Sequence, residues 1–135
     1  MRKLGTLEVW IDEDSTKSSF TKRDNVTGDY KIVLNPKGDK ERSGEDNTPA
    51  VLAHELGHFV GRILETPAAM NSGRYHSSAN DTLVAEKEAW KFADEIVPGI
   101  SESTIAKKAI GNYSNIAKNA GHMPMGLLMD LGFIR

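Results

Sequence analysis

The chain has 135 residues, a formal net charge of -2, and 39% hydrophobic and 27% charged residues, as in one globular domain rather than a disordered or fibrous chain. Its charges are mixed in sign and form no basic stripe, so direct binding of nucleic acid is not expected. It contains no cysteine, which excludes disulfides and thiolate metal sites, so any metal must be bound by histidine or carboxylate side chains.

The N-terminal part of the chain is predicted to form strands. Apolar Leu7, Val9 and Ile11 alternate with other residues in the pattern of a half-buried strand. A second strand is predicted over 30–34, closed by Asn-Pro, with a short strand near 19–21 between the two. The polar segment 36–47 is expected to be a solvated loop.

Helices follow the strands. Thr48-Pro49 is a favourable helix start, and the first helix is expected to run through about Leu64. A polar loop over 66–80 precedes a second helix, from about Asp81 to just before Pro98. The remaining residues are expected to form two or three short helices, broken at Gly111, Gly121 and Pro124. Strands followed by helices predict a single α+β domain over 1–135, a small antiparallel sheet packed on helices.

Neither targeting nor membrane insertion is indicated by the sequence. Acidic residues occur too soon after the N-terminus to leave room for the apolar core of a signal peptide. No apolar run approaches the length of a membrane span. We therefore expect a cytoplasmic protein with no membrane partner. Its oligomeric state is not indicated.

The first predicted helix contains a candidate metal-binding and catalytic motif. It is His54-Glu55-Leu56-Gly57-His58, which matches H-E-x-x-H. Residues four apart on a helix are about 40° apart around its axis, so both imidazoles point the same way and can bind one ion. Glu55 is then placed to take a proton from metal-bound water. An apolar stripe on the opposite side of the helix favours this interpretation over two chance surface histidines; it contains Leu52, Leu56, Phe59 and Ile63.

A hydrolytic zinc site needs a third protein ligand, and the second predicted helix offers two glutamates. An apolar stripe runs along this helix through Val84, Ala85, Ala89, Phe92 and Ile96. Glu88 falls within that stripe, where a carboxylate is costly unless it is paired or binds metal. Glu86 lies on the flank. The pattern thus favours Glu88 as the third ligand, with Glu86 as the alternative.

At this point the sequence resembles the ImmA/IrrE-type metallopeptidases, small gluzincins of bacteria, phages and mobile elements. The resemblance rests on residues 51–59, VLAHELGHF, and 86–93, EKEAWKFA, and it extends to Ile-Val-Pro at 96–98. It implies bound zinc, a gluzincin-like core and cleavage of peptide bonds, in several members those of a transcriptional repressor. Trp90 stands where the family often has asparagine, and no helix-turn-helix is evident.

The metzincins are a rival zinc family. His58-Phe59-Val60-Gly61 begins their H-x-x-G-x-x-H extension, but the third histidine would fall at Leu64, which cannot bind metal. The sequence therefore favours a zinc metalloendopeptidase of the gluzincin kind, acting on a protein or peptide substrate.

Other residues are candidates to stabilise the oxyanion that forms during hydrolysis. They are Tyr75, His76, Tyr113 and His122, of which His76 and His122 are favoured, and His122 is also a possible ligand. The strand at 30–34 is either an edge strand beside the cleft, along which substrate could add as a further strand, or an ordinary core strand, and the sequence does not favour one over the other.

Two other functions are compatible with the sequence. The first is a catalytically idle zinc-binding regulator or inhibitor from a phage or mobile element; the intact Glu55 argues against it. The second is an interaction protein in which the motif occurs by accident. Stoichiometric zinc in the purified protein separates this second alternative from the other two hypotheses.

Overall fold

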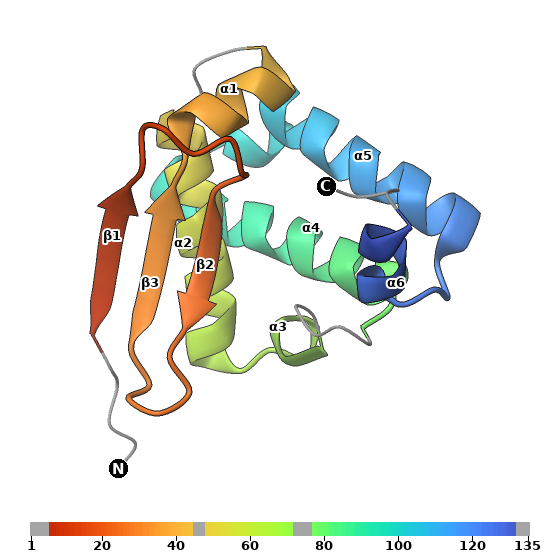
Figure 1. The fold of residues 1–135 in the computed structure, drawn as a ribbon, viewed down its shortest axis with the longest axis horizontal. Helices are drawn as coiled ribbons and strands as arrows, with labels where there is room; N and C mark the ends of the chain where they lie inside the picture. The colour runs from red at the N-terminus through yellow and green to blue at the C-terminus, as the bar shows by residue number, and fades with distance from the viewer. Residues whose placement is uncertain (1–5, 45–47, 72–76, 132–135) are drawn as a thin grey trace.

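A computed structural model of the chain describes residues 6–44, 48–71 and 77–131. Within them, a three-stranded sheet lies on one side of a group of helices (Figure 1). In chain order the elements are β1 (Leu7–Ile11), β2 (Phe20–Arg23), β3 (Tyr30–Leu34), α1 (Pro36–Ser43), α2 (Thr48–Leu64), α3 (Pro67–Asn71), α4 (Ala79–Ile96), the 3-10 turn η1 (Ile100–Glu102), α5 (Thr104–Ala120) and α6 (Met125–Asp130). The predicted α+β class is confirmed.

The sheet is mixed rather than antiparallel, in the order β1-β3-β2. The turn after β2 sends β3 back beside it in the antiparallel sense, with Thr21 opposite Ile32. β1 pairs with the other side of β3 in the parallel sense, with Val9 opposite Ile32. β3 is therefore the central strand, which agrees with the alternative of an ordinary core strand and excludes that of an edge strand. The strands at the edges of the sheet are β1 and β2.

Two expected loops contain helices. α1 occupies 36–43, where Pro36 takes an early helical position and Gly44 ends the helix in a left-handed conformation with φ 80°. Its residues are polar on every face, so the apolar periodicity that reveals a helix is missing. α3 similarly lies within the expected 66–80 loop. In contrast, Gly111 does not break a helix, because α5 continues through it.

The sheet packs on α2 mainly through β3. Tyr30, Ile32 and Leu34 are buried on the helix-facing side of β3, and the Tyr30 ring meets Phe59 of α2 edge to face, with centroids 5.0 Å apart. β1 lies at the outer edge of the sheet in Figure 1, and its Val9 is half exposed. The apolar alternation of β1 thus marks a strand correctly but not a buried one.

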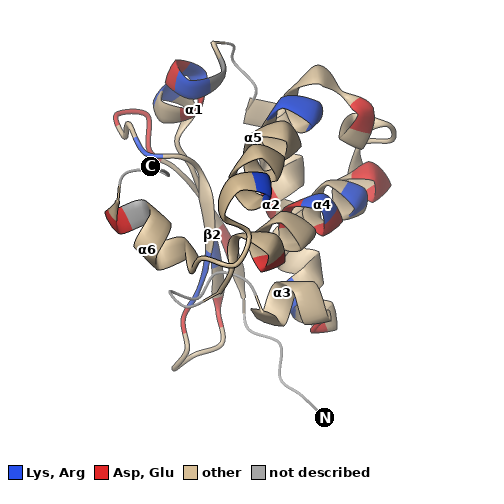
Figure 2. Cartoon of the chain, turned by 90° about the vertical axis from the view of Figure 1, so that its right-hand side faces the viewer, with Lys and Arg blue, Asp and Glu red and all other residues tan. Residues whose placement is uncertain are grey.

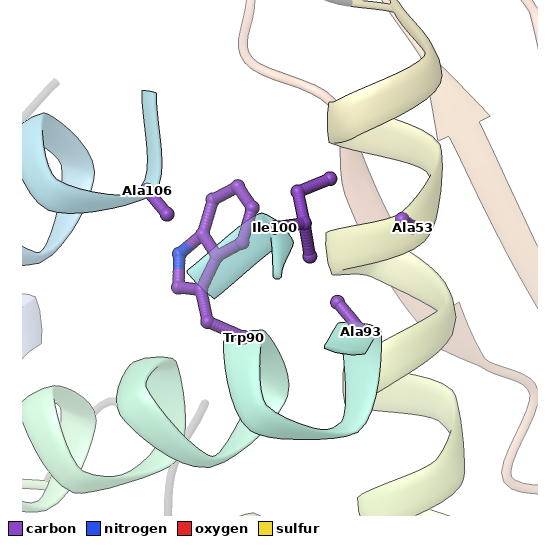
Figure 3. Packing of buried hydrophobic residues seen from close by; sticks show 5 residues of the cluster. All are labelled: Ala53, Trp90, Ala93, Ile100 and Ala106. Carbon is purple, nitrogen blue, oxygen red and sulfur yellow. The ribbon is translucent and has the colours of Figure 1, made fainter. Parts of the chain in front are cut away.

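α2 and α4 approach one another closely because α2 carries small residues where they meet. A Cβ atom on Gly57 would lie 2.0 Å from the backbone carbonyl oxygen of Ala89. Next to this contact, Trp90 packs among small and aliphatic side chains (Figure 3). The cluster contains Ala53 of α2, Trp90 and Ala93 of α4, Ile100 of η1 and Ala106 of α5. It links the motif helix to α4, η1 and α5.

We therefore expect Gly57→Ala to destabilise the protein, by about 1–3 kcal/mol or more, because α2 and α4 must separate to admit the methyl group. Urea unfolding measures the change. Gly111→Ala is the matched control: nothing lies within 4 Å of the added Cβ, and the substitution should stabilise α5 by about 0.5–1 kcal/mol. Equal stability of the two variants would contradict the close contact.

Charges of both signs are interspersed on the helices, as α1 and α4 show in Figure 2. In the part of the chain that the structure describes, no helix combines the length and apolar character needed to cross a membrane.

Candidate metal centre

The two motif histidines lie on the same side of α2, as their spacing predicts. Their ring centroids are 4.5 Å apart and the ring planes are inclined at 65°. The side chains of His54 and His58 are only 14% and 22% exposed. Regular helical geometry over 48–64 is enough to produce this pair, because one turn of helix brings residue i+4 back above residue i.

Glu86 of α4 joins the two histidines. Its Oε2 atom lies 2.7 Å from Nε2 of His54, and its Oε1 atom lies 3.2 Å from Nε2 of His58. One donor atom from each of the three residues lies within 4.8 Å of the others. Among the described residues, no other set of three or more His, Cys, Asp or Glu side chains is arranged to hold a metal ion.

The structure thus corrects the expected position of Glu88. Glu88 is not part of the group of donor atoms and accepts a hydrogen bond from the hydroxyl of Thr66. The predicted stripe was wrongly placed, because Val84 and Ile96 are 55% and 46% exposed. The buried residues of α4 are Ala79, Ala85, Ala89, Trp90 and Ala93. Glu86 precedes the last three of these by three, four and seven residues, so it shares their face of the helix.

Glu55 is 5% exposed and points toward β2. The hydroxyl of Thr21 donates to Glu55 Oε2 at 2.6 Å, and Glu55 Oε1 lies 3.6 Å from Nδ1 of His54. Burial raises the pKa of Glu55 above its ordinary value, although the two histidines and the Thr21 hydrogen bond oppose the rise. The carboxylate is therefore held in place by a neighbouring strand and made more basic by its surroundings.

The ionisation of Glu86 and of His58 is coupled. Burial opposes the charge on Glu86, but the charges and hydrogen bonds of His58 and His54 lower its pKa well below the ordinary value. Burial likewise opposes the charge on His58 and is the largest single effect, but the charge and hydrogen bond of Glu86 and the charge of Glu55 together exceed it, so the pKa of His58 is raised. Two carboxylates, the buried Glu55 and the partly buried Glu86, thus lie in one small site and require positive charge beside them.

Trp90 fixes the orientation of the first histidine. Its ring stacks on the imidazole of His54, with centroids 4.5 Å apart and planes inclined at only 16°. Trp90 is 2% exposed and belongs to the core cluster, so the imidazole packs against a ring that is itself held in place. Trp90 therefore supports one face of the His54 imidazole.

Tyr113 is the oxyanion candidate that the structure brings toward the site. α5 runs back along α4, since Ala106 packs with Trp90 while the carbonyl of Gly121 accepts from the backbone N–H of Asn80. Tyr113 lies midway between these two contacts, level with Glu86. Burial raises the pKa of Tyr113 far above its ordinary value, and the charges of Glu86 and Glu55 add to the rise. Its hydroxyl therefore stays protonated and able to donate.

One of the two favoured oxyanion candidates, His122, lies among the described residues and is not brought to the site. His122 is exposed in the turn after α5 and is not part of the His54, His58 and Glu86 group. His76 lies outside the described residues, as does Tyr75.

A hollow of about 130 Å³ opens beside the side chains of Glu55, His58 and Glu86. It is lined by Thr21, Glu55, His58 and Glu86 and, farther along α2, by Arg62. A larger hollow of about 380 Å³ lies over the sheet, but it does not contain imidazoles. The chemistry of the side chains, rather than the size of the hollow, marks the smaller one as the candidate site.

The three side chains fit a zinc ion by the type and position of their donor atoms. Two imidazole nitrogens and a carboxylate oxygen form one of the established hydrolytic donor sets. Ligand atoms about 2.0–2.1 Å from a tetrahedral zinc are about 3.4 Å apart, close to the 3.2 Å between His58 Nε2 and Glu86 Oε1. The 2.7 Å contact of His54 with Glu86 is a hydrogen-bond distance, so a bound ion requires only a small separation of these atoms.

Comparisons of the chain with protein-family models, with curated proteins and with solved structures give no match. The geometry of the site therefore carries the functional interpretation.

Proposed function

We propose that the protein is a zinc-dependent endopeptidase in which His54, His58 and Glu86 bind the metal and Glu55 is the general base. The observation that carries the proposal is the convergence of the two Nε2 atoms of α2 on a single carboxylate of α4, beside a second buried carboxylate. Zinc, when bound there, supplies a water of lowered pKa and polarises the scissile carbonyl.

Glu55 has the position and the environment that a base requires. It is adjacent in sequence to one proposed ligand but does not join the group of donor atoms formed by His54, His58 and Glu86. Its raised pKa makes the carboxylate a better proton acceptor, and the same carboxyl can then return the proton to the leaving amine. Thr21 restrains the carboxylate from the side of the sheet. These features favour turnover over an idle metal-binding regulator, which has no need of such a base.

β2 is the strand that supports binding of an extended substrate. It is an edge strand, and its Thr21 both lines the hollow and donates a hydrogen bond to the proposed base. An extended peptide can hydrogen-bond to such an edge while its scissile bond reaches the metal. The proposed substrate is therefore a protein segment in extended conformation.

Tyr113 is the proposed oxyanion donor. Tyr113 belongs to α5 and is close enough to Glu86 and Glu55 for their charges to raise its pKa, whereas Glu55 contacts the sheet through Thr21. A donor and a base on different sides of the metal can act on the carbonyl oxygen and the attacking water respectively.

Removal and return of zinc test the proposal. The protein, loaded with one equivalent of zinc, is incubated with a mixture of protein-derived peptides, and new termini are identified by mass spectrometry. We expect cleavage that ceases after dialysis against a chelator and returns with zinc, because the metal supplies the water and polarises the carbonyl. Stoichiometric zinc without any cleavage would instead support the idle regulator. Failure to bind zinc would contradict both functions.

A further inference from the structure

Arg62 extends the candidate site in one direction along α2. It follows His58 by four residues and therefore lies one helical turn beyond it on the same side of the helix. Its side chain lines the 130 Å³ hollow together with Thr21, Glu55 and Glu86. Apart from histidine, Arg62 is the only basic residue among the described residues that line this hollow.

The guanidinium of Arg62 has no carboxylate partner among the residues that the structure describes. Within 6–44, 48–71 and 77–131, no ion pair within 4.0 Å involves Arg62, although it is half-buried. The two carboxylates of the hollow are already engaged: Glu55 accepts from Thr21, and Glu86 contacts the histidines. A partly buried cation without a partner is costly unless a ligand supplies the opposite charge.

The other walls near Arg62 restrict what can enter. Ala69 of α3 and Ala85 and Thr82 of α4 are small, and they leave a narrow space rather than a wide apolar pocket. A planar carboxylate suits such a space, because the guanidinium fork donates two parallel hydrogen bonds to it.

We infer that Arg62 binds a carboxylate of the peptide substrate next to the scissile bond, so that the enzyme selects acidic substrates. The inference rests on the proposed peptidase function. The carboxylate has two possible sources: an Asp or Glu side chain, or the terminal carboxylate of a peptide cleaved near its end. The chemistry recognised is the same in both cases.

The inference is tested by binding, without turnover, to the zinc-loaded Glu55→Gln chain. The probes are a blocked alanine peptide with a central glutamate, its glutamine counterpart, and an alanine peptide ending in a free carboxylate with its amide counterpart. We expect the chain to bind one carboxylate probe with an affinity about tenfold to a hundredfold higher than that of its neutral counterpart, as is typical of hydrogen bonds to charged groups. The pair that shows the preference identifies the source.

Matched variants in the same background assign the preference to Arg62. Arg62→Gln should abolish it, and Arg62→Lys should retain part of it, since lysine keeps the charge without the fork. Lys22→Gln removes the same charge from β2 without altering the hollow and should leave the preference unchanged. A preference that survives Arg62→Gln, or none in any chain, would overturn the inference.

Zinc content separates this inference from the proposed function. Arg62→Gln should keep one zinc per chain, which also shows that the variant is folded. If zinc is bound and no carboxylate preference appears, the inference is wrong while the metal site stands. If zinc is not bound, the peptidase proposal fails, and the same probes titrated into the metal-free chains still decide whether Arg62 selects carboxylates.

Discussion

Glu86→Gln is expected to weaken zinc binding by more than about a hundredfold. Loss of an outer-shell partner alone typically costs 10–100-fold in metal affinity, and Glu86 is proposed as a direct ligand. Glutamine has nearly the same shape but no charge, so the two histidines lose the anionic donor that completes the set. Competition of the protein with a chromophoric chelator measures the affinity.

Glu88→Gln is the matched control for this prediction. It makes the same change two residues away on the same helix, at a carboxylate that bonds to Thr66 instead of facing the histidines. We expect its zinc affinity to be unchanged within error. The opposite pattern, with zinc lost in Glu88→Gln and kept in Glu86→Gln, would identify Glu88 as the third ligand, as the apolar pattern of the sequence predicts.

Glu55→Gln is expected to lower the rate of peptide cleavage by about 10²–10⁴-fold, the usual contribution of a general base. The amide cannot take a proton from water, but its oxygen can still accept from Thr21, so the fold and the zinc content should remain. Initial rates on a peptide found in the cleavage screen, with zinc measured on the same samples, separate loss of the base from loss of the metal.

Glu88→Gln again serves as the control, because it removes one negative charge from the same region without altering Glu55 or the group that holds the metal. Full activity in this variant, together with loss of activity in Glu55→Gln, assigns the effect to the base. Equal rates for Glu55→Gln and the wild-type chain would exclude the proposed role of Glu55.

The pair of histidines was predictable because it depends on one helix only. Once 48–64 is helical, His54 and His58 must share a side, whatever packs around them. The helix itself is signalled by Thr48-Pro49 and by apolar spacing. Local geometry of this kind is independent of tertiary context, so sequence reasoning reaches it reliably.

The choice between Glu86 and Glu88 was not predictable in the same way. Two residues correspond to about 200° around a helix, so Glu86 and Glu88 lie on nearly opposite faces, and the choice depends on which face of α4 is buried. The error came from Val84 and Ile96, which are apolar but exposed. What sets the face is the close contact of Gly57 with the backbone of α4, a tertiary feature.

The remaining parts of the site depend on long-range packing. Thr21 reaches Glu55 only because β3 occupies the middle of a mixed sheet and leaves β2 at the edge beside α2. Tyr113 comes level with Glu86 only because α5 reverses along α4. A sequence signal for Arg62 does exist: it continues the His54 and His58 series by one further turn of the helix.

The most direct test is the position of zinc in crystals of the zinc-loaded protein, located by its anomalous scattering. We predict a single peak bound by Nε2 of His54, Nε2 of His58 and a carboxylate oxygen of Glu86, with Glu55 nearby but not a ligand. A peak bound by Glu88, a peak remote from the two histidines, or no peak at this site would contradict the proposed centre.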